Sequence, residues 1–389
     1  MQMTLPMQLP DETLYSLLAR IAISNGMSGI EIVRRLLGDP NALSSIGCKV
    51  DLHHFSIIMD GAYGGVSEII SALTILPIQR RLGEVEDSEL ALVGEGKRRL
   101  SLDALVFGRD RGLKWKICHE CMKEDVATYG VAYWHRSHQI TSTICCSKHG
   151  EYLRSFALPR RELHEQFLLP HNVTHKISPD AFVIQTDNLG IYAEFSLLAK
   201  EALNDTGLPA STMAIHRVFK TSLMELGFLA RREDICKRST FLRELGLNER
   251  AYNFLLDHVG VRSPRQFLYG IADNRPVLPF SRLMLVHWLF GSWKVFKQRC
   301  QWQDVLDQPG NGHGATTNEE QNSSRLDEVR HIHRQACLEY KSSCERPTRL
   351  GFTRTAQLSA RWLLQNDRQW LDEEIPVLSH RNDQKKLFD

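Results

Sequence analysis

One stretch decides how this chain folds: Cys118-His119-Glu120-Cys121, then 24 intervening residues, then Cys146-Ser147-Lys148-His149. Each pair has a two-residue spacer, which lets one tight turn aim both side chains at a single ion. Three thiolates and one imidazole suit Zn²⁺, and four protein ligands leave no open position for water. We therefore expect a structural Zn²⁺ site, whose metal supplies folding energy to a segment poor in core residues. Its expected ligands are Cys118, Cys121, Cys146 and His149.

Four other side chains near this stretch are weaker candidates for metal binding. Cys145 directly precedes Cys146 and could replace it, but it lacks the two-residue spacer before His149. We therefore expect Cys145 to be an alternate ligand or a thiol outside the ligand set. Lone histidines close to such a site more often hydrogen-bond the backbone than bind the metal. This applies to His119, His135 and His138.

The composition is that of an ordinary globular protein. The chain has 389 residues, of which 42% are hydrophobic and 24% are charged, and its formal net charge is +2. At roughly 100–200 residues per domain, this length suggests two to four domains. No stretch approaches the ~20 apolar residues of a membrane span, and the first ten residues lack the features of a secretion signal. Nine cysteines, an odd number, argue against a disulfide framework, so we expect a reduced, cytoplasmic protein.

Helical periodicity dominates on both sides of the cysteine-rich stretch, so the expected fold class is mainly α. Leu14 to Ile21 predict one amphipathic helix that ends at Asn25-Gly26, and Ser28 can cap a second helix. Two short helices around a glycine turn are typical of a helix-turn-helix unit. Further helices are expected over Ile57–Leu76, Ile191–Asn204, Met213–Leu226, Ile235–Leu245, Arg250–Val259, Phe280–Cys300, Leu326–Tyr340 and Thr353–Leu371.

We expect the chain to divide into five parts. Residues 1–100 form an N-terminal helical, helix-turn-helix-like unit, residues 101–170 a zinc-binding module, and residues 171–302 a helical region with a helix-turn-helix-like part. Residues 303–324 are rich in Gln, Asn, Gly and Ser, and this composition predicts a linker. Residues 325–389 form a last helical segment, with Trp362, Leu363 and Trp370 in its core.

The sequence gives little sign of enzyme chemistry. Gly94-Glu95-Gly96-Lys97 lacks the spacing and the Ser or Thr of a phosphate-binding loop. No G-x-S-x-G nucleophile motif occurs. His135 and His138 have no paired carboxylates nearby in the sequence, as a divalent-metal nuclease would need. We therefore expect a protein without catalytic residues and without a cofactor other than zinc.

Two groups of basic residues could form a surface that binds nucleic acid or another partner. Seven basic residues lie between Lys97 and Lys116, against Asp103 and Asp110. The second group, in the N-terminal helical unit, is Arg20, Arg34 and Arg35. Both groups can equally be ordinary solvated side chains, since a net charge of +2 is small for a protein whose main task is to coat DNA.

Beyond these features, the sequence resembles the TniQ/TnsD family, which selects target sites for cut-and-paste bacterial transposons. The segments that carry most of the resemblance are Cys118 to Asp125, Tyr133-Trp134-His135-Arg136-Ser137-His138-Gln139, and Cys146-Ser147-Lys148-His149-Gly150. Leu9 to Leu17 is similar to the family's N-terminal element, Pro279 to Gly291 to its helical C-terminal part, and Trp362 to Leu371 to the tail of larger members. The chain departs from the family at Cys145, where an apolar residue is usual.

The resemblance implies a non-catalytic adaptor. Such proteins join a target-recognition device to the transposon's AAA+ regulator, TnsC, which recruits the transposase. In one mode, TniQ proteins of CRISPR-associated transposons dock as a homodimer on a Cascade complex, whose guide RNA reads the target DNA by base pairing. In the other mode, TnsD-like members bind a fixed attachment site in DNA through helix-turn-helix and zinc elements.

Charge favours the RNA-guided mode. Reading a DNA site directly requires basic and amide side chains aimed at phosphates and base edges. The segment Arg231–Arg250 has six basic residues against four acidic ones, which is a modest DNA surface. The near-neutral total and a length that is short for a fixed-site reader point the same way. We expect an adaptor between Cascade and TnsC in the bacterial cytoplasm, with a direct, TnsD-like DNA-binding protein as the alternative.

Overall fold

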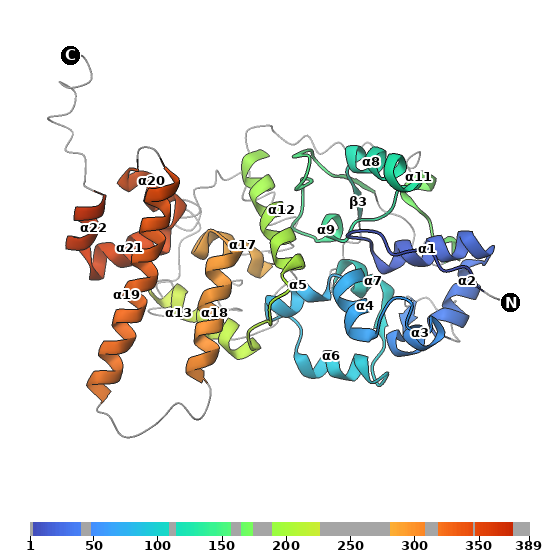
Figure 1. Cartoon of the computed structure of the whole chain (residues 1–389), viewed down its shortest axis with the longest axis horizontal. Coiled ribbons are helices and arrows are strands. Elements are labelled where there is room, and N and C mark those ends of the chain that lie inside the picture. The colour runs from blue at the N-terminus through green and yellow to red at the C-terminus, as the bar shows by residue number, and fades with distance from the viewer. Residues whose placement is uncertain are drawn as a thin grey trace, which may run out of the picture. The chain divides into compact units, whose positions relative to one another are not determined.

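The computed structural model describes residues 3–39, 48–108, 114–156, 165–173, 189–225, 281–307, 318–344 and 347–375 (Figure 1). Helices dominate these residues and the strands are few and short, which confirms the expected mainly α fold class. None of the described helices is long and apolar enough to cross a membrane. The described residues fall into two compact units, one with 3–213 and 281–284 and the other with 214–225 and 285–375.

The first unit is built from short helices and two small antiparallel sheets. Its helices up to the metal-binding stretch are α1 (Leu14–Asn25), α2 (Gly29–Glu31), the π-helix η1 (Ile32–Leu36), α3 (Leu52–Ile58), α4 (Val66–Leu73), α5 (Leu76–Arg81), α6 (Asp87–Gly94) and α7 (Leu102–Phe107). They are followed by α8 (His119–Tyr129), α9 (Arg136–Gln139), α11 (Pro170–Val173) and α12 (Leu189–Asn204). Strand β1 (Lys49–Val50) pairs with β2 (Leu100–Ser101), and β3 (Trp115–Ile117) pairs with β4 (Arg154–Phe156).

The first N-terminal helix ends, and the second begins, where the sequence predicts. The Thr13 side chain accepts a hydrogen bond at the start of α1, and Gly26 ends this helix in the left-handed conformation, with φ of 60°. Ser28 and Glu31 form a reciprocal capping box at the start of α2. The second helix then continues as the π-helical turn η1 rather than as a regular α-helix.

One hydrophobic core includes side chains from both of the parts expected at 1–100 and 101–170. The ring of Tyr15 on α1 lies 4.7 Å from that of Trp115 on β3 and 5.1 Å from that of Phe167. The ring of Trp134 lies 4.5 Å from that of Trp115. Since burying an aromatic side chain of this kind stabilises a fold by about 1.5–3 kcal/mol, these two parts of the chain stabilise each other. The boundary expected after residue 100 passes through β2.

The helical periodicity expected through Ile57–Leu76 is divided among three helices, α3, α4 and α5. α3 ends at Ile58 and α4 begins at Val66, and the turn between them includes Gly64 with φ of 80°. Glycine takes this conformation without the steric cost that other residues meet. The apolar periodicity persists across the turn because both helices face the same core.

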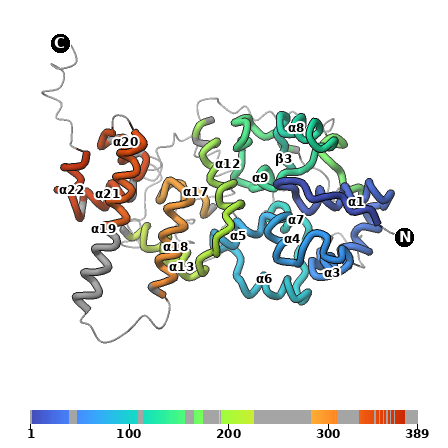
Figure 2. Tube along the Cα trace, in the orientation of Figure 1, coloured from blue at the N-terminus to red at the C-terminus, as the bar shows by residue number. Residues whose placement is uncertain are grey.

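α12 lies against α5 and α9 in the first unit, and it confirms the helix expected over Ile191–Asn204 (Figure 2). Tyr192, Phe195 and Ala199 on this helix are buried. In the second unit, α13 (Thr212–Glu225) likewise confirms the helix expected over Met213–Leu226.

The helix expected over Phe280–Cys300 is two helices, α17 (Ser281–Phe290) and α18 (Trp293–Asp307). The break falls at Gly291, whose φ is 68°. A Cβ atom at Gly291 would lie 2.9 Å from the carbonyl oxygen of Thr355, so the chain needs glycine here for space as well as for conformation. Phe296 on α18 packs against Phe219 of α13, with ring centroids 5.1 Å apart.

The C-terminal helices of the second unit form a small core of their own. They are α19 (Asn318–Ser343), α20 (Arg349–Thr355), α21 (Gln357–Asn366) and α22 (Arg368–Glu374). The helix expected over Thr353–Leu371 is therefore wrong, because the chain turns near Ala356 and again at Asp367. Leu363 and Leu371 are buried in this core, and Trp362 and Trp370 pack against it while partly exposed.

Some expected elements lie wholly or partly outside the described residues. These are the helices over Ile235–Leu245 and Arg250–Val259 and the helix-turn-helix-like part around Arg231–Arg250. Of the expected linker 303–324, residues 303–307 belong to α18 and residues 318–324 to α19, and the remainder is outside the described part.

Candidate metal centre

Cys118 and Cys121 lie at the start of α8. Strand β3 leads directly into Cys118, which has the extended conformation of an N-cap residue, with φ of −100° and ψ of 131°. Cys121 follows in the first turn of the helix, where the Met122 N–H already donates to the Cys118 carbonyl oxygen at 3.1 Å. The two-residue spacer therefore spans the strand-to-helix junction, and both side chains are buried.

Cys146 and His149 lie in a tight turn between two short extended segments. The Gly150 N–H donates to the Cys146 carbonyl oxygen at 2.8 Å, and the Cys146 N–H donates to the Glu151 carbonyl oxygen at 2.7 Å. Gly150 supplies the left-handed residue that this turn needs, with φ of 67°. The turn leaves the side chains of both expected ligands on one side.

The pairing of β3 with β4 brings the two ligand pairs together. Ile117, the residue before Cys118, is opposite Arg154 in the antiparallel register. Cys118 therefore continues next to Leu153, which is buried in one cluster with Cys118, Cys121 and Cys146. The 24 residues between the pairs are bridged by this sheet contact and not by local sequence.

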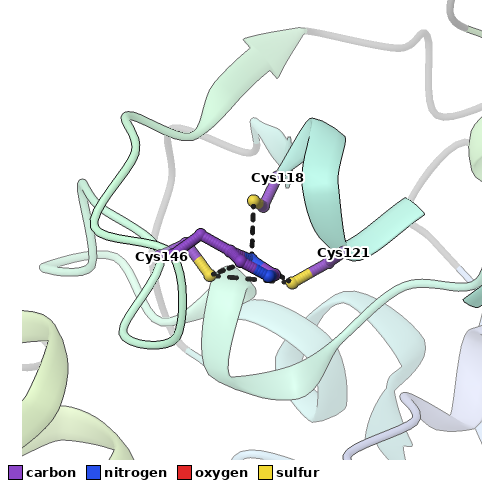
Figure 3. A group of neighbouring side chains, drawn as sticks. Cys118, Cys121 and Cys146 are labelled. Atoms are coloured by element: carbon purple, nitrogen blue, oxygen red, sulfur yellow. Dashed lines mark hydrogen bonds between the residues drawn. The ribbon is translucent and has the colours of Figure 1, made fainter. Parts of the chain in front are cut away.

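The four predicted ligands converge on one point (Figure 3). One ligand atom from each of Cys118, Cys121, Cys146 and His149 lies within 4.8 Å of all the others, and they are the residues of the described chain that could hold a metal ion. His149 Nδ1 lies 3.4 Å from the sulfurs of Cys118 and Cys121 and 3.6 Å from that of Cys146. The sulfurs of Cys121 and Cys146 are 3.6 Å apart.

These distances fit a tetrahedral zinc site. With Zn–S of about 2.3 Å and Zn–N of about 2.0–2.1 Å, the edges of the tetrahedron are about 3.6 Å for S···N and about 3.8 Å for S···S. The observed S···N distances of 3.4 to 3.6 Å and the S···S distance of 3.6 Å agree with these edges. The donor set and its spacing therefore suit a tetrahedral N/S-binding ion.

The electrostatics of the three thiols also favour a cation. Hydrogen bonds from Cys118 and Cys121 lower the pKa of Cys146. Hydrogen bonds with Cys118 and Cys146 raise the pKa of Cys121. One sulfur thus becomes a thiolate easily, and its negative charge opposes ionisation of its neighbour. A divalent cation removes this opposition, because each thiolate then faces positive charge.

The four weaker candidates for metal binding all lie outside the cluster of Cys118, Cys121, Cys146 and His149. Cys145 is buried but outside the four-residue group, and its N–H lies 3.3 Å from the Ser196 hydroxyl oxygen on α12. His119 is exposed. His135 faces carboxylates, with Nε2 2.9 Å from Asp125 Oδ2. His138 alone of these three histidines reaches a ligand, with Nε2 3.9 Å from Cys121 Sγ, and burial lowers its pKa.

Sequence reasoning missed two residues at the edge of the site, Glu124 and Lys148. Glu124 Oε1 lies 3.2 Å from His149 Nε2, and Glu124 Oε2 pairs with the Lys148 ammonium group. The ion pair lowers the pKa of Glu124. Glu124 is one helical turn beyond Cys121 and Lys148 precedes His149, but no local pattern shows that they pair, because Glu124 is 24 and 25 residues from Lys148 and His149.

Two of the segments that carry the family resemblance, Leu9 to Leu17 and Tyr133 to Gln139, bind each other. The Thr13 N–H donates to the Trp134 carbonyl oxygen at 2.9 Å, and the Trp134 N–H donates to the Ser16 hydroxyl oxygen at 2.8 Å. The Ser137 hydroxyl and N–H both donate to Asp11 Oδ2, at 2.5 and 3.2 Å. These polar residues therefore have structural partners about 120 positions away in the chain.

Arg20, one of the three arginines considered for a partner surface, is part of this internal network. Its Nη1 lies 2.8 and 3.0 Å from the two carboxylate oxygens of Glu12, and its Nη2 donates to the Met7 carbonyl oxygen at 2.9 Å. The Glu12 side chain is 0% exposed and that of Arg20 is 12% exposed. Arg34 and Arg35 are exposed at η1.

The basic stretch from Lys97 to Lys116 does not form one free cationic surface over its described members. Lys97, Arg98 and Arg99 pair with Glu95, Glu89 and Asp51, at 2.7, 2.9 and 3.4 Å respectively. The Lys116 ammonium group donates to the carbonyl oxygens of Ile140 and Thr143, at 2.5 and 2.8 Å. Arg109 and Arg111 lie outside the described residues.

The fold and the site together define a class of protein: a mainly helical chain whose N-terminal part contains a candidate metal-binding set, Cys118, Cys121, Cys146 and His149. The comparison with known families then names that domain. Residues 4–153 match the TniQ family model. The chain therefore contains a TniQ domain, which includes α1 to α9 and all four residues of the candidate metal-binding set.

The TniQ domain is associated with transposition, in which it is generally a non-catalytic accessory domain. No curated protein matches the sequence. Strand β4 and helix α12 lie beyond residue 153 but pack against the matched part. The folded unit thus extends past the family match.

Proposed function

We propose that this protein is a non-catalytic adaptor that couples an RNA-guided Cascade complex to the AAA+ regulator TnsC, which recruits the transposase. The observation that carries the proposal is the match of residues 4–153 to the TniQ family. The sequence resemblance to TniQ proteins of CRISPR-associated transposons adds the partners. The adaptor acts as a homodimer in the bacterial cytoplasm and reaches target DNA through Cascade and its guide RNA.

The pairing of basic side chains supports this mode over direct DNA binding. A protein that binds duplex DNA by itself uses lysine and arginine side chains to neutralise phosphates. In this chain Lys97, Arg98 and Arg99 each face a carboxylate, and Arg20 is held by Glu12. The ion pairs of these side chains would have to break before the side chains could bind phosphate.

The metal-binding set is proposed to hold one Zn²⁺ with a structural role. Cys118, Cys121, Cys146 and His149 fill all four tetrahedral positions, so no position remains for a water or substrate. Zn²⁺ bound there supplies folding free energy to the junction of β3, α8 and the turn after Cys146. The module then acts as a rigid connector between the helical parts of the protein.

Metal content tests the zinc site directly. Elemental analysis of the full-length chain, purified without chelator and supplied with Zn²⁺, is expected to give about one zinc per chain. Cys146→Ser is expected to lose this zinc, and Cys145→Ser, the adjacent buried cysteine outside the set, is expected to keep it. Absence of zinc from the wild-type chain, or equal loss in both variants, contradicts the assignment.

Co-purification tests the partners. The tagged full-length chain is expected to retain Cascade only when guide RNA is present, to bind TnsC, and to elute at the mass of a dimer in light-scattering chromatography. A direct, TnsD-like selector would instead bind a duplex attachment site alone, with affinity that falls steeply as salt rises through counterion release. That result, without Cascade retention, overturns the RNA-guided proposal in favour of the alternative.

A further inference from the structure

We propose that two residues outside the ligand set, Glu124 and His138, position the metal centre: Glu124 orients the His149 imidazole, and His138 donates a hydrogen bond to the cysteine sulfurs. This inference rests on the proposed zinc site. Both residues come from elements that also carry or touch the ligands, since Glu124 is on α8 and His138 is on α9.

Glu124 joins the two halves of the site. It lies on the helix that begins with Cys118 and Cys121, and its carboxylate meets the Lys148-His149 end of the other half. His149 turns Nδ1 toward the three sulfurs, so Nε2 carries the proton and donates it to Glu124 Oε1 at 3.2 Å. A carboxylate in this place fixes the tautomer and the ring orientation that a metal-binding imidazole needs.

Lys148 helps to hold the Glu124 carboxylate in the orientation that accepts from His149. The Lys148 ammonium group pairs with Glu124 Oε2, which leaves Glu124 Oε1 to accept the hydrogen bond from His149 Nε2. The neighbouring carboxylate on α8, Glu120, pairs with Lys123 at 2.7 Å and lies outside the metal-binding set. Glu120 therefore offers a matched control on the same helix.

His138 approaches the sulfurs from the buried side. Its side chain is 3% exposed, its Nε2 lies 3.9 Å from Cys121 Sγ, and it also hydrogen-bonds Cys146. Three thiolates around one divalent cation leave a net charge of −1 in this buried place. An N–H donor withdraws electron density from sulfur and offsets part of that charge, as donors beside metal-bound sulfur do elsewhere.

The first test measures zinc release from the full-length holoprotein into a colorimetric chelator. Glu124→Ala is expected to speed release by about 10–100-fold, the range found when such outer partners are lost. Glu124→Gln keeps an acceptor oxygen and is expected to stay within about threefold of wild type, and Glu120→Ala is expected to match wild type. Release from Glu124→Ala at the wild-type rate overturns the role of Glu124.

The second test uses the absorption spectrum of the Co²⁺-substituted protein. His138→Leu removes the donor, which raises the energy of the sulfur lone pairs, so the thiolate-to-cobalt charge-transfer band is expected to move to lower energy. His138→Gln keeps an N–H and is expected to restore the band, which a purely steric effect would not do. If His138→Leu does not fold, His138→Gln with a shifted band still contradicts the proposal.

The metal centre and the roles of Glu124 and His138 can be contradicted independently. A wild-type chain that holds neither Zn²⁺ nor Co²⁺ removes the metal centre itself. A wild-type chain that holds the metal, together with unchanged release in Glu124→Ala and an unchanged band in His138→Leu, removes the positioning roles and leaves the centre intact.

Discussion

Replacing Arg20 by alanine tests whether this arginine belongs to the interior or to a partner surface. The Glu12 carboxylate is 0% exposed, accepts both contacts from Arg20 Nη1, and accepts a further hydrogen bond from the Leu9 N–H at 3.0 Å. Arg20→Ala leaves this buried carboxylate without its cation. Removing one partner of a buried ion pair costs about 3–5 kcal/mol of the free energy of unfolding.

Protonation of Glu12 sets a limit on that cost. Burial already raises the pKa of Glu12 above its usual value of 4.5, and the attraction of Arg20 acts in the opposite direction. Without Arg20, the folded protein can avoid a buried negative charge if the Glu12 carboxylate is protonated. At pH 7 this costs about 1.4 kcal/mol for each of the 2.5 pH units above 4.5, or about 3.5 kcal/mol. We therefore expect a loss of about 2–3 kcal/mol at pH 7, since Arg20 is itself slightly exposed.

The sign of the pH dependence follows from the raised pKa. A carboxyl group with a higher pKa in the folded state stabilises the fold below pH 4.5, and this contribution is lost as pH rises toward the folded pKa. Arg20→Ala raises the folded pKa of Glu12 further. The defect relative to wild type is therefore expected to shrink as pH falls, to about 1.4 kcal/mol near pH 5.5.

Urea unfolding followed by tryptophan fluorescence measures these differences, because Trp115 and Trp134 lie in the same core as α1. Arg34→Ala, at an exposed arginine of the same N-terminal unit, is the matched control and is expected to stay within about 0.5 kcal/mol of wild type. The double variant Glu12→Gln with Arg20→Ala buries no charge and is expected to lose the extra pH slope. A change below about 0.5 kcal/mol in Arg20→Ala, with no pH dependence, would refute the reasoning.

Two further predictions concern the second unit. Burial, and then repulsion from Arg299, lowers the pKa of His333 to about 2, so the fold is most stable above pH 6.5 and loses stability as pH falls below it. The free energy of unfolding should drop by about 1.4 kcal/mol between pH 8 and 5.5, and this slope should vanish in His333→Gln, measured by urea titration at each pH. Gly291→Ala should lower the free energy of unfolding by roughly 1–3 kcal/mol, because Gly291 has a left-handed backbone and lies close to Thr355. Gly190→Ala is the control and should not destabilise the fold, because the space around its Cβ is open. Equal urea midpoints for the two variants would contradict this prediction.

The four clustered candidate ligands could be predicted from the sequence because their signal is local. In both pairs a two-residue spacer fits one turn of backbone, whether at the strand-to-helix junction at Cys118 or in the tight turn after Cys146. The helix ends at Gly26 and Ser28 were predictable for the same reason, since capping depends on neighbours within a few residues. The breaks at Gly64 and Gly291 were missed because apolar periodicity runs through them.

The partners of the polar residues were not predictable. Asp11 and Glu12 look like the acidic start of a helix, yet Asp11 binds Ser137 and Glu12 binds Arg20 in the interior. Glu124 gave no sign of facing His149 from the other half of the metal-binding set. Each of these contacts depends on where a distant or separately folded segment of the chain lies.

Local spacing and periodicity were enough to predict the helical class, the four clustered candidate ligands and the family resemblance, because both signals act over a few residues. Tertiary packing sets which charges are buried, which arginines are exposed and what surrounds the candidate metal-binding set. Those properties follow from the packing of segments that are 24 to about 120 residues apart, through the β3–β4 pair and the core shared by α1 and Trp134. Burial and electrostatics are properties of that packing, and no local pattern encodes them.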